Sequence, residues 1–329
     1  MSFFSPRTLA RRLSLLTLGL LSLSALADQA FPNKPIKLIV PFAAGGSTDL
    51  VARLVAERMH QELGQAVVVD NRGGAGGIMG TEAVAMAAPD GYTIGMATAS
   101  TMTVNPLFYD KAAATNRQLR PLVNLLSIPV VFSVHPSLPA RDFAGFIAEL
   151  KRKPGVYSTA VPGVGSLGHL LVESFNDTLG VKVVNVPYRG MGPALNDALA
   201  GTLQFIPDQL PSALPHIKAG KLLPVAVASD KRLAELPQVP TLKELGHADL
   251  NDLGNSWFGL MIPAKTPPAI AERLRAAALK AVQSPQAAAR LQQMGASVVG
   301  GDSSSFQALI DTQLKRNRAI VRRANIKLD

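Results

Sequence analysis

A regular alternation of short apolar segments with longer amphipathic ones constrains the fold of this chain more than any other feature of its sequence. The apolar segments, such as residues 36–40, have the length and β-branched content of buried strands. The amphipathic segments repeat their apolar residues with the helical period, and Gly64 and the Pro-Asp-Gly turn at 89–91 mark helix ends. This alternation predicts a mostly parallel sheet with helices on both faces. In the first part of the chain we expect strands at 36–40, 66–69 and 92–96, and helices at 49–63 and 80–87.

A second round of the same alternation follows a long apolar run at 122–134. It predicts strands at 157–160, 181–186, 203–206 and 223–228, and helices at 143–151, 167–179, 193–200 and 210–219. A strand-like segment at 256–263 and helices at 268–283, 285–294 and 304–324 complete the chain. The fold class is therefore α/β, with two doubly wound lobes joined by crossing strands at 122–134 and 223–228. We expect residues 28–125 and 229–329 to form the first lobe, and residues 126–228 to form the second.

The first 27 residues have the organisation of a secretory signal peptide. Arg7, Arg11 and Arg12 precede an uncharged apolar run at 13–26, which ends in the small-x-small sequence Ala25-Leu26-Ala27. The run is shorter than the ~20 apolar residues that span a bilayer, so a membrane anchor is the weaker interpretation. We expect export to a bacterial periplasm and a mature chain starting near Asp28. The Arg11-Arg12 pair leaves the twin-arginine route open, although the ordinary apolar run favours the general secretory route.

Composition excludes several classes of function. The chain has no cysteine, which rules out cysteine nucleophiles, zinc–thiolate sites and iron–sulfur clusters. Its formal net charge is +10, with much of the excess between Lys315 and Lys327, where a solvated helix face or long-range attraction of anions could explain it. Basic residues are not interleaved with aromatic ones, so nucleic acid is not an expected partner. A mature chain of about 300 residues is long enough for two ordinary cores.

The loop after the first expected strand, at residues 41–49, reads Pro-Phe-Ala-Ala-Gly-Gly-Ser-Thr-Asp. Two glycines allow the backbone to turn tightly and to approach a ligand closely. Ser47 or Thr48 is expected to cap the following helix, whose first-turn amides and dipole would form an anion site. An ordinary connection between a strand and a capped helix is the alternative.

A second loop, at residues 161–169, occupies the same topological position in the second lobe. It matches G-x-G-x-x-G through Gly163, Gly165 and Gly168, but no carboxylate follows at the end of the next expected strand, so a dinucleotide is disfavoured. Ser166 and the neighbouring amides are better interpreted as donors to a carboxylate. We expect no cofactor.

Other strand ends supply further candidates, because ligands of open α/β sheets bind outside the carboxyl ends of the strands. Thr98 and Ser100 follow the third expected strand. Asp208 follows the strand at 203–206, and it could accept a hydrogen bond from an amine or hydroxyl of a ligand or be a carboxylate of a surface turn.

Catalytic and metal-binding patterns are missing. The five histidines lack metal-ligand spacing such as H-E-x-x-H, and no serine lies in G-x-S-x-G. Ser166 and His169, three residues apart on an expected helix, could share a face as nucleophile and base. A structural role is the favoured interpretation of this pair, so we expect no catalytic residue. The histidine spacing leads us to expect no metal.

Many stretches across the mature chain together match one family. They are 31–36, 40–49, 71–77, 88–93, 186–190, 210–221, 239–241 and 257–260. With these motifs the chain resembles the solute-binding receptors of tripartite tricarboxylate transporters, also called the Bug family. The resemblance implies a type II periplasmic-binding-protein fold, and a small organic acid gripped by backbone amides, hydroxyls and ordered water. The ligand-binding residues that we expect are Phe42, Ala43, Ser47, Thr48, Asp49, Thr98, Ser100, Ser166, His169 and Asp208. Pro207-Asp208-Gln209 departs from the Phe-Asp-Asn common in the family, and this departure bears on ligand identity.

The expected function is that of a periplasmic, monomeric receptor without catalytic activity. Hinge closure would bring a ligand carboxylate between the helix N-termini of both lobes. The loaded receptor would then dock on membrane permease subunits, or on a sensor kinase if its role is signalling. A hydrolase or isomerase using Ser166 and His169 is the remaining alternative.

Overall fold

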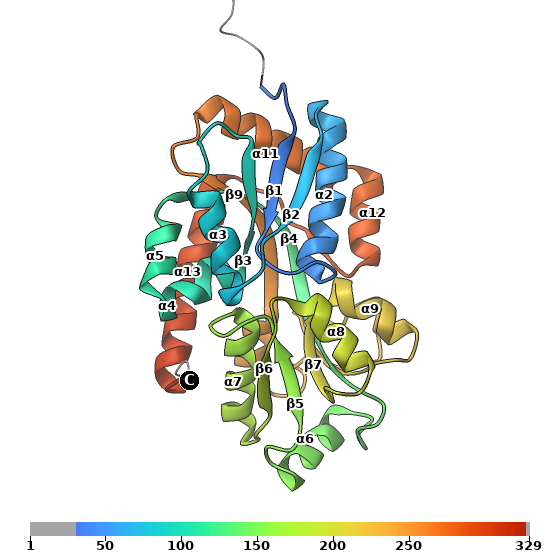
Figure 1. Cartoon of the computed structure of the whole chain (residues 1–329). Coiled ribbons are helices and arrows are strands. Elements are labelled where there is room, and N and C mark those ends of the chain that lie inside the picture. Colours follow the sequence, from blue (N-terminus) through green and yellow to red (C-terminus); the bar gives the residue numbers. More distant parts are fainter. Residues whose placement is uncertain (1–30, 327–329) are drawn as a thin grey trace, which may run out of the picture.

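Strand β4 (Leu119–Val134) passes through both lobes of the molecule and connects them (Figure 1). The structure is a computed structural model, and it describes residues 31–326. The first part of β4, from Leu119 to Pro129, pairs antiparallel with β9 (Asn255–Pro263) in the first lobe. Its last residues, from Val130 to Val134, pair with β7 (Phe205–Gln209) and β8 (Leu223–Ala228) in the second. At ~3.3 Å per residue, a strand of this length reaches about 50 Å, enough to serve both sheets.

The first lobe is built on a sheet in the order β2-β1-β3-β9-β4. The pairs β1–β2 and β1–β3 are parallel, whereas β9 is antiparallel to β3. Its other strands are β1 (Ile36–Val40), β2 (Val67–Asn71), β3 (Thr93–Thr98) and the short β10 (Ser297–Val298).

Helices cover this sheet on both sides, with α2 and α12 on one side and α3, α5 and α13 on the other in the view of Figure 1. Apolar side chains of α2 and α11 pack with those of β1, β3, β4 and β9 in one core cluster, which is why these helices bury a single face. The helical elements are α2 (Ser47–Leu63), η2 (Ala75–Gly77), α3 (Ile78–Ala85), η3 (Ser100–Val104), α4 (Asn105–Phe108), α5 (Asp110–Asn116), α11 (Pro268–Gln283), α12 (Pro285–Gln293) and α13 (Ser303–Arg323).

The second lobe repeats the arrangement with strands β6-β5-β7-β4, and β8 adds to β4. Its centre is a cluster of packed phenylalanine rings, Phe132, Phe146, Phe175 and Phe205, with ring centroids 4.8 to 5.9 Å apart. Such aromatic packing contributes stability beyond the buried area alone. The elements are α6 (Phe143–Arg152), β5 (Ser158–Val161), α7 (Leu167–Leu179), β6 (Val184–Pro187), α8 (Met191–Leu199), α9 (Leu210–Lys218) and α10 (Ala248–Gly254).

The two-lobed α/β fold expected from the sequence is confirmed, with one correction to its connections. β8 was expected to cross between the lobes, but it pairs with Val130–Val134 of β4 and so lies in the second lobe. The chain returns to the first lobe through residues 229–254, which include α10. Helices η3 to α5, α10 and strand β10 were not predicted, because they are short and lack a clear apolar period. The expected signal peptide lies outside the described residues, and no helix in residues 31–326 has the length and apolarity to cross a membrane.

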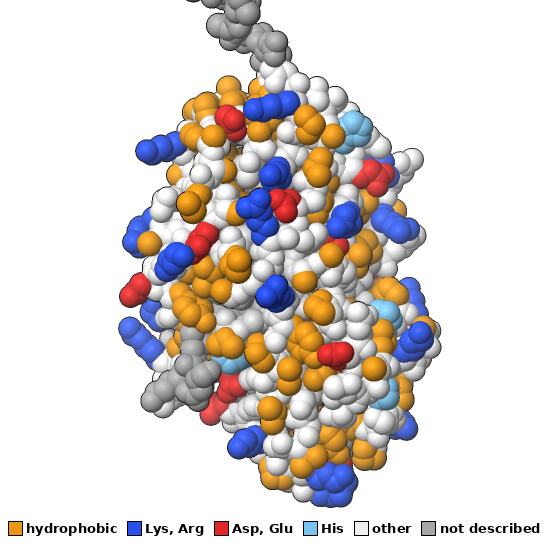
Figure 2. All heavy atoms as spheres, in the orientation of Figure 1, with side chains coloured by type: hydrophobic (Ala, Val, Ile, Leu, Met, Phe, Trp, Pro, Cys, Tyr) orange, Lys and Arg blue, Asp and Glu red, His pale blue; other side chains and the backbone are white. Residues whose placement is uncertain are grey.

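Charged side chains are spread over the surface. On the face in Figure 2, basic and acidic side chains are interspersed with apolar ones. On α13, Lys315, Arg318, Arg322 and Arg323 are exposed, which favours the solvated-helix interpretation of the basic C-terminal stretch.

Candidate functional site

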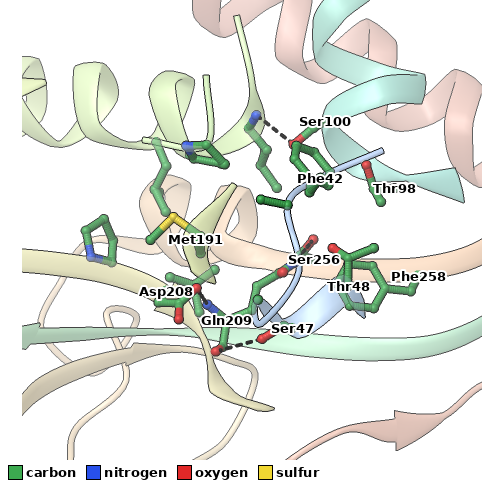
Figure 3. Close-up of a pocket in the computed structure, with 18 residues that line it drawn as sticks. Phe42, Ser47, Thr48, Thr98, Ser100, Met191, Asp208, Gln209, Ser256 and Phe258 are labelled. Atoms are coloured by element: carbon green, nitrogen blue, oxygen red, sulfur yellow. Dashed lines mark hydrogen bonds between the residues drawn. The ribbon is translucent and has the colours of Figure 1, made fainter. Parts of the chain in front are cut away.

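A cavity lies between the lobes, where loops at the carboxyl ends of β1, β3, β5 and β7 meet (Figure 3). It has a volume of about 640 Å³, including its open mouth. The position is the one that an open α/β sheet provides for a ligand. Its lining residues are Phe42, Ala43, Gly46, Ser47, Thr48, Thr98, Ser100, Val130, Pro162, Leu167, Gly168, Leu171, Met191, Pro207, Asp208, Gln209, Ser256 and Phe258.

The N-terminus of α2 forms one wall of the cavity. Helix α2 begins at Ser47, and its N-cap is Gly46, without a side-chain cap, so the expectation that Ser47 or Thr48 caps the helix is wrong. Within the described part of the chain, nothing accepts a hydrogen bond from the amides of Gly46, Ser47 and Thr48. First-turn amides point out of a helix end and carry its positive dipole, so this wall is suited to an anion.

The N-terminus of α7 faces the same cavity from the second lobe. Ser166 is its N-cap and accepts a hydrogen bond from the His169 amide at 3.2 Å. The Leu167 amide donates across the cleft to Ser100 Oγ at 3.0 Å. The amide of Gly168, which lines the cavity, has no acceptor in residues 31–326. The structure therefore brings two helix N-termini, one from each lobe, to a single cavity.

Replacing Ser166 by alanine is expected to lower the free energy of unfolding by about 1 kcal/mol, because a buried N-cap bond is lost. The Ser166 side chain is fully buried and does not line the cavity, so the loss acts on the fold. Urea unfolding of the wild type and the variant measures this difference. An unchanged midpoint would show that the cap contributes nothing.

Asp208 is the acidic residue of the cavity lining, and it lies at the end of β7. Its carboxylate accepts hydrogen bonds from the Gln209 amide at 2.8 Å and from Ser212 Oγ at 2.6 Å. Burial raises the pKa of Asp208 to about 7, and these two bonds offset only part of that effect. The residue is 2% exposed, which rules out the surface-turn interpretation.

Ser47 connects the first lobe to Asp208. Its Oγ lies 2.6 Å from Ser212 Oγ, accepts from the Ser212 amide at 3.0 Å and donates to the Gln209 carbonyl at 3.1 Å. Ser212 in turn donates to Asp208. The hydroxyl of Ser47 is thus engaged with the second lobe, and it is the backbone amide that remains free for a ligand.

Most of the residues expected at the site line the cavity: Phe42, Ala43, Ser47, Thr48, Thr98, Ser100 and Asp208. Asp49, Ser166 and His169 do not. Burial alone would raise the pKa of Asp49, but hydrogen bonds from Arg53 and the Gly45 amide lower it overall, so the carboxylate holds the loop in place.

His169 also supports a loop. Its Nδ1 accepts from the Gly165 amide at 3.2 Å, and burial lowers the pKa of the imidazole, which keeps it neutral. The hydrogen bond between Ser166 and His169 runs to the backbone amide of His169 rather than to its ring. The pair is not arranged as nucleophile and base.

Several lining residues were not predicted as site residues, among them Val130, Leu171, Met191, Gln209, Ser256 and Phe258. Val130 and Phe258 belong to the antiparallel strands β4 and β9, whose side chains reach the cleft from the middle of long apolar runs. No local pattern marks such positions. Gln209 could have been found, because it follows Asp208 at the end of β7.

Glycines allow the two lobes to approach closely beside the cavity. A Cβ on Gly192 of α8 would lie 2.0 Å from the Ala44 carbonyl oxygen, and one on Gly163 would lie 2.5 Å from the Gly76 amide nitrogen. The Ala43 amide donates to the Arg189 carbonyl at 3.0 Å across the same boundary. The structure therefore shows the lobes in contact, with backbone packed on backbone.

No lysine, arginine or histidine is among the residues that line the cavity. Within residues 31–326, no group of three or more histidine, aspartate or glutamate side chains is placed to hold a metal ion.

Two α/β lobes with a cleft between them, and two helix N-termini in that cleft, define a solute-binding protein. The family model described as "Tripartite tricarboxylate transporter family receptor" matches residues 51–326. The chain belongs to this family, which confirms the resemblance found in its sequence.

Individual relatives support the same assignment. Protein BugT of Bordetella pertussis is 34% identical over 91% of this chain and 91% of its own length. A structure described as that of a periplasmic transporter is 43% identical, with a TM-score of 0.88 over 91% of this chain and 100% of that one. An R. palustris protein solved with adipate is 31% identical, with a TM-score of 0.85 over 91% of this chain and 99% of that one. MatC from Rhodopseudomonas palustris, solved with bound malate, is 30% identical, with a TM-score of 0.81 over 88% of this chain and 100% of that one.

Proposed function

We propose that this protein is a periplasmic receptor that captures a small organic carboxylate in the cavity between its lobes. The observation that carries the proposal is the pair of helix N-termini, from α2 and α7, whose unpaired amides share one cavity. Related proteins solved with adipate and malate have the same fold and support an organic acid as the ligand.

Backbone amides suit reversible capture of an anion. They carry partial charges that are already oriented, so the site does not need to bury and desolvate an arginine when it is empty. On this proposal the ligand carboxylate accepts from the amides of Ser47 and Thr48 on one side and of Gly168 on the other. Each lobe alone would hold the carboxylate weakly, and both together favour the closed arrangement.

The proposal also states which parts of the chain form each lobe and which membrane proteins receive the ligand. Residues 1–27 would direct export. Residues 28–125 and 255–329 would move as one lobe and residues 126–254 as the other, which shifts the second boundary expected from the sequence because α10 packs on α7 and β8. The loaded monomer would deliver its ligand to the membrane subunits of a tripartite tricarboxylate-type transporter. The arrangement of Ser166 and His169, in which the ring does not contact the hydroxyl, supports a binding role without catalysis.

A thermal-shift screen of the purified protein against carboxylates and neutral nutrients tests this function. A ligand present at 100 times its dissociation constant adds roughly 2.7 kcal/mol of stability, which is a clear shift of the melting temperature. Calorimetry would then compare the best acid with its primary amide, which has the same shape but no charge. The proposal expects the amide to bind at least about tenfold more weakly, and equal binding of acid and amide would refute the carboxylate site.

A further inference from the structure

Helix α9 of the second lobe receives its cap from the first lobe. Its own N-cap residue, Gln209, makes no side-chain bond to the helix. The amide of Ser212, the third residue of α9, donates instead to Ser47 Oγ at 3.0 Å. An amide at this position is one that an N-cap side chain ordinarily satisfies. Ser47 therefore acts as a helix cap across the boundary between the lobes.

The cap belongs to a small buried network of hydrogen bonds. Ser47 Oγ lies 3.1 Å from the Gln209 carbonyl oxygen (Figure 3) and 2.6 Å from Ser212 Oγ, and its single proton can serve either acceptor. Ser212 Oγ donates to the Asp208 carboxylate at 2.6 Å, which leaves its lone pairs free to accept from Ser47. The two serines are only 2% and 3% exposed. Each bond between Ser47 and the second lobe exists only while the lobes are in contact.

Ser47 also belongs to the wall that faces the ligand cavity. It is the first residue of α2, and within residues 31–326 nothing accepts a hydrogen bond from its backbone amide. The amide is thus available to a carboxylate while the side chain contacts the opposite lobe. When the lobes separate, water replaces the partners of the Ser47 hydroxyl, so the network favours the closed form by only a modest free energy.

We propose that the Ser47 hydroxyl is a latch, which holds the lobes closed around a bound carboxylate by capping α9 and so slows release of the ligand. The inference rests on the proposed receptor function. It assigns Ser212, which does not line the cavity, as the partner of Ser47 on the second lobe. The latch forms after the ligand has entered the cleft and the lobes have met. It therefore lowers the dissociation rate constant and leaves the association rate constant nearly unchanged.

The rate at which a radiolabelled acid leaves the protein, after addition of an excess of unlabelled acid, measures the latch. The acids are malate, adipate and any further carboxylate that raises the melting temperature in a thermal-shift screen. Ser47→Ala keeps the backbone amide and should speed release about fivefold to tenfold, as expected for a lost helix cap. Ser212→Ala should speed release about threefold, because the amide at position 212 still donates to Ser47. In the Ser47→Ala background, Ser212→Ala should produce no further change.

Ser284→Ala is the matched control, since Ser284 caps α12 by accepting from the Ala287 amide within the first lobe. It removes a cap of the same kind and should leave the release rate unchanged. Release at the wild-type rate from Ser47→Ala would overturn the latch. So would an equal effect of Ser212→Ala with and without the Ser47 hydroxyl, because the change would then act through Asp208 alone. Both results leave the receptor function standing, whereas failure of every carboxylate to bind would refute that function and the latch with it.

Discussion

Replacing Gly192 by alanine is expected to weaken ligand binding by about tenfold to a hundredfold while the protein remains folded. The new Cβ would lie 2.0 Å from the carbonyl oxygen of Ala44. The position of a Cβ is fixed by the backbone and the Ala44 oxygen is itself a backbone atom, so no side chain can rotate away. Overpacking of this kind costs about 1 to 3 kcal/mol, and about 1.4 kcal/mol corresponds to a factor of ten in affinity.

The clash exists only while the lobes are in contact, so separating the lobes relieves it. Gly192 lies in the first turn of α8 and has no positive φ, which means that alanine fits its helix. We therefore expect the urea unfolding of the free protein to change by no more than the cost of separating its lobes, together with weaker calorimetric binding of the acid identified by thermal shift.

Gly145→Ala is the matched control for Gly192→Ala. Gly145 also lies in the first turn of a helix, α6, and its Cβ would meet only residues next to that helix, namely Asp142 and Ala140. The control should bind the ligand like the wild type. If Gly192→Ala also bound like the wild type, closure of the lobes at this contact would play no part in ligand capture.

The ligand-free protein is expected to lose stability between about pH 4 and pH 7 through Asp208. The pKa of this carboxyl is about 7 in the folded protein, against 3.8 when it is unperturbed. Between these values the folded state holds a proton that the unfolded state releases, so raising the pH favours unfolding. At 1.36 kcal/mol per pKa unit, the effect on the free energy of unfolding reaches at most about 4 kcal/mol.

Asp208→Asn should remove this slope, because the carboxamide does not titrate. Urea unfolding of both proteins at pH 5 and pH 8 measures it, and the remaining titratable groups cancel in the difference between wild type and variant. We expect the wild type to lose stability relative to Asp208→Asn as the pH rises. Parallel pH profiles would mean that Asp208 is ionised throughout and that its burial is compensated by contacts other than those described above.

The main features of the site followed from the sequence because they depend on local rules. Strand and helix alternate, so the loop after β1 and the loop after β5 each had to lie at the carboxyl edge of its own part of the sheet. The two glycines of the first loop indicated close backbone approach to a ligand, whereas the packing of Gly163 on Gly76 of the other lobe was not predicted. The loop positions thus predicted a helix N-terminus at the edge of each sheet, and the resemblance to the family implied that the two meet at one ligand.

The roles of individual polar side chains could not be predicted in the same way. Ser47 was expected to cap α2 or bind the ligand, but its hydroxyl bonds Ser212, 165 residues away in the sequence. Ser166 and His169 were candidates for the grip, but each uses its side chain on a neighbouring amide. A hydroxyl or imidazole near a helix start can face either its own backbone or the cleft, and tertiary packing decides between them.

A crystal structure of the protein with its acid ligand tests the central claim most directly. The account predicts a carboxylate within hydrogen-bond distance of the amides of Ser47 and Thr48 on the first lobe and of Gly168 on the second. A carboxylate bound elsewhere in the cavity, or held by the amides of one lobe only, would contradict it.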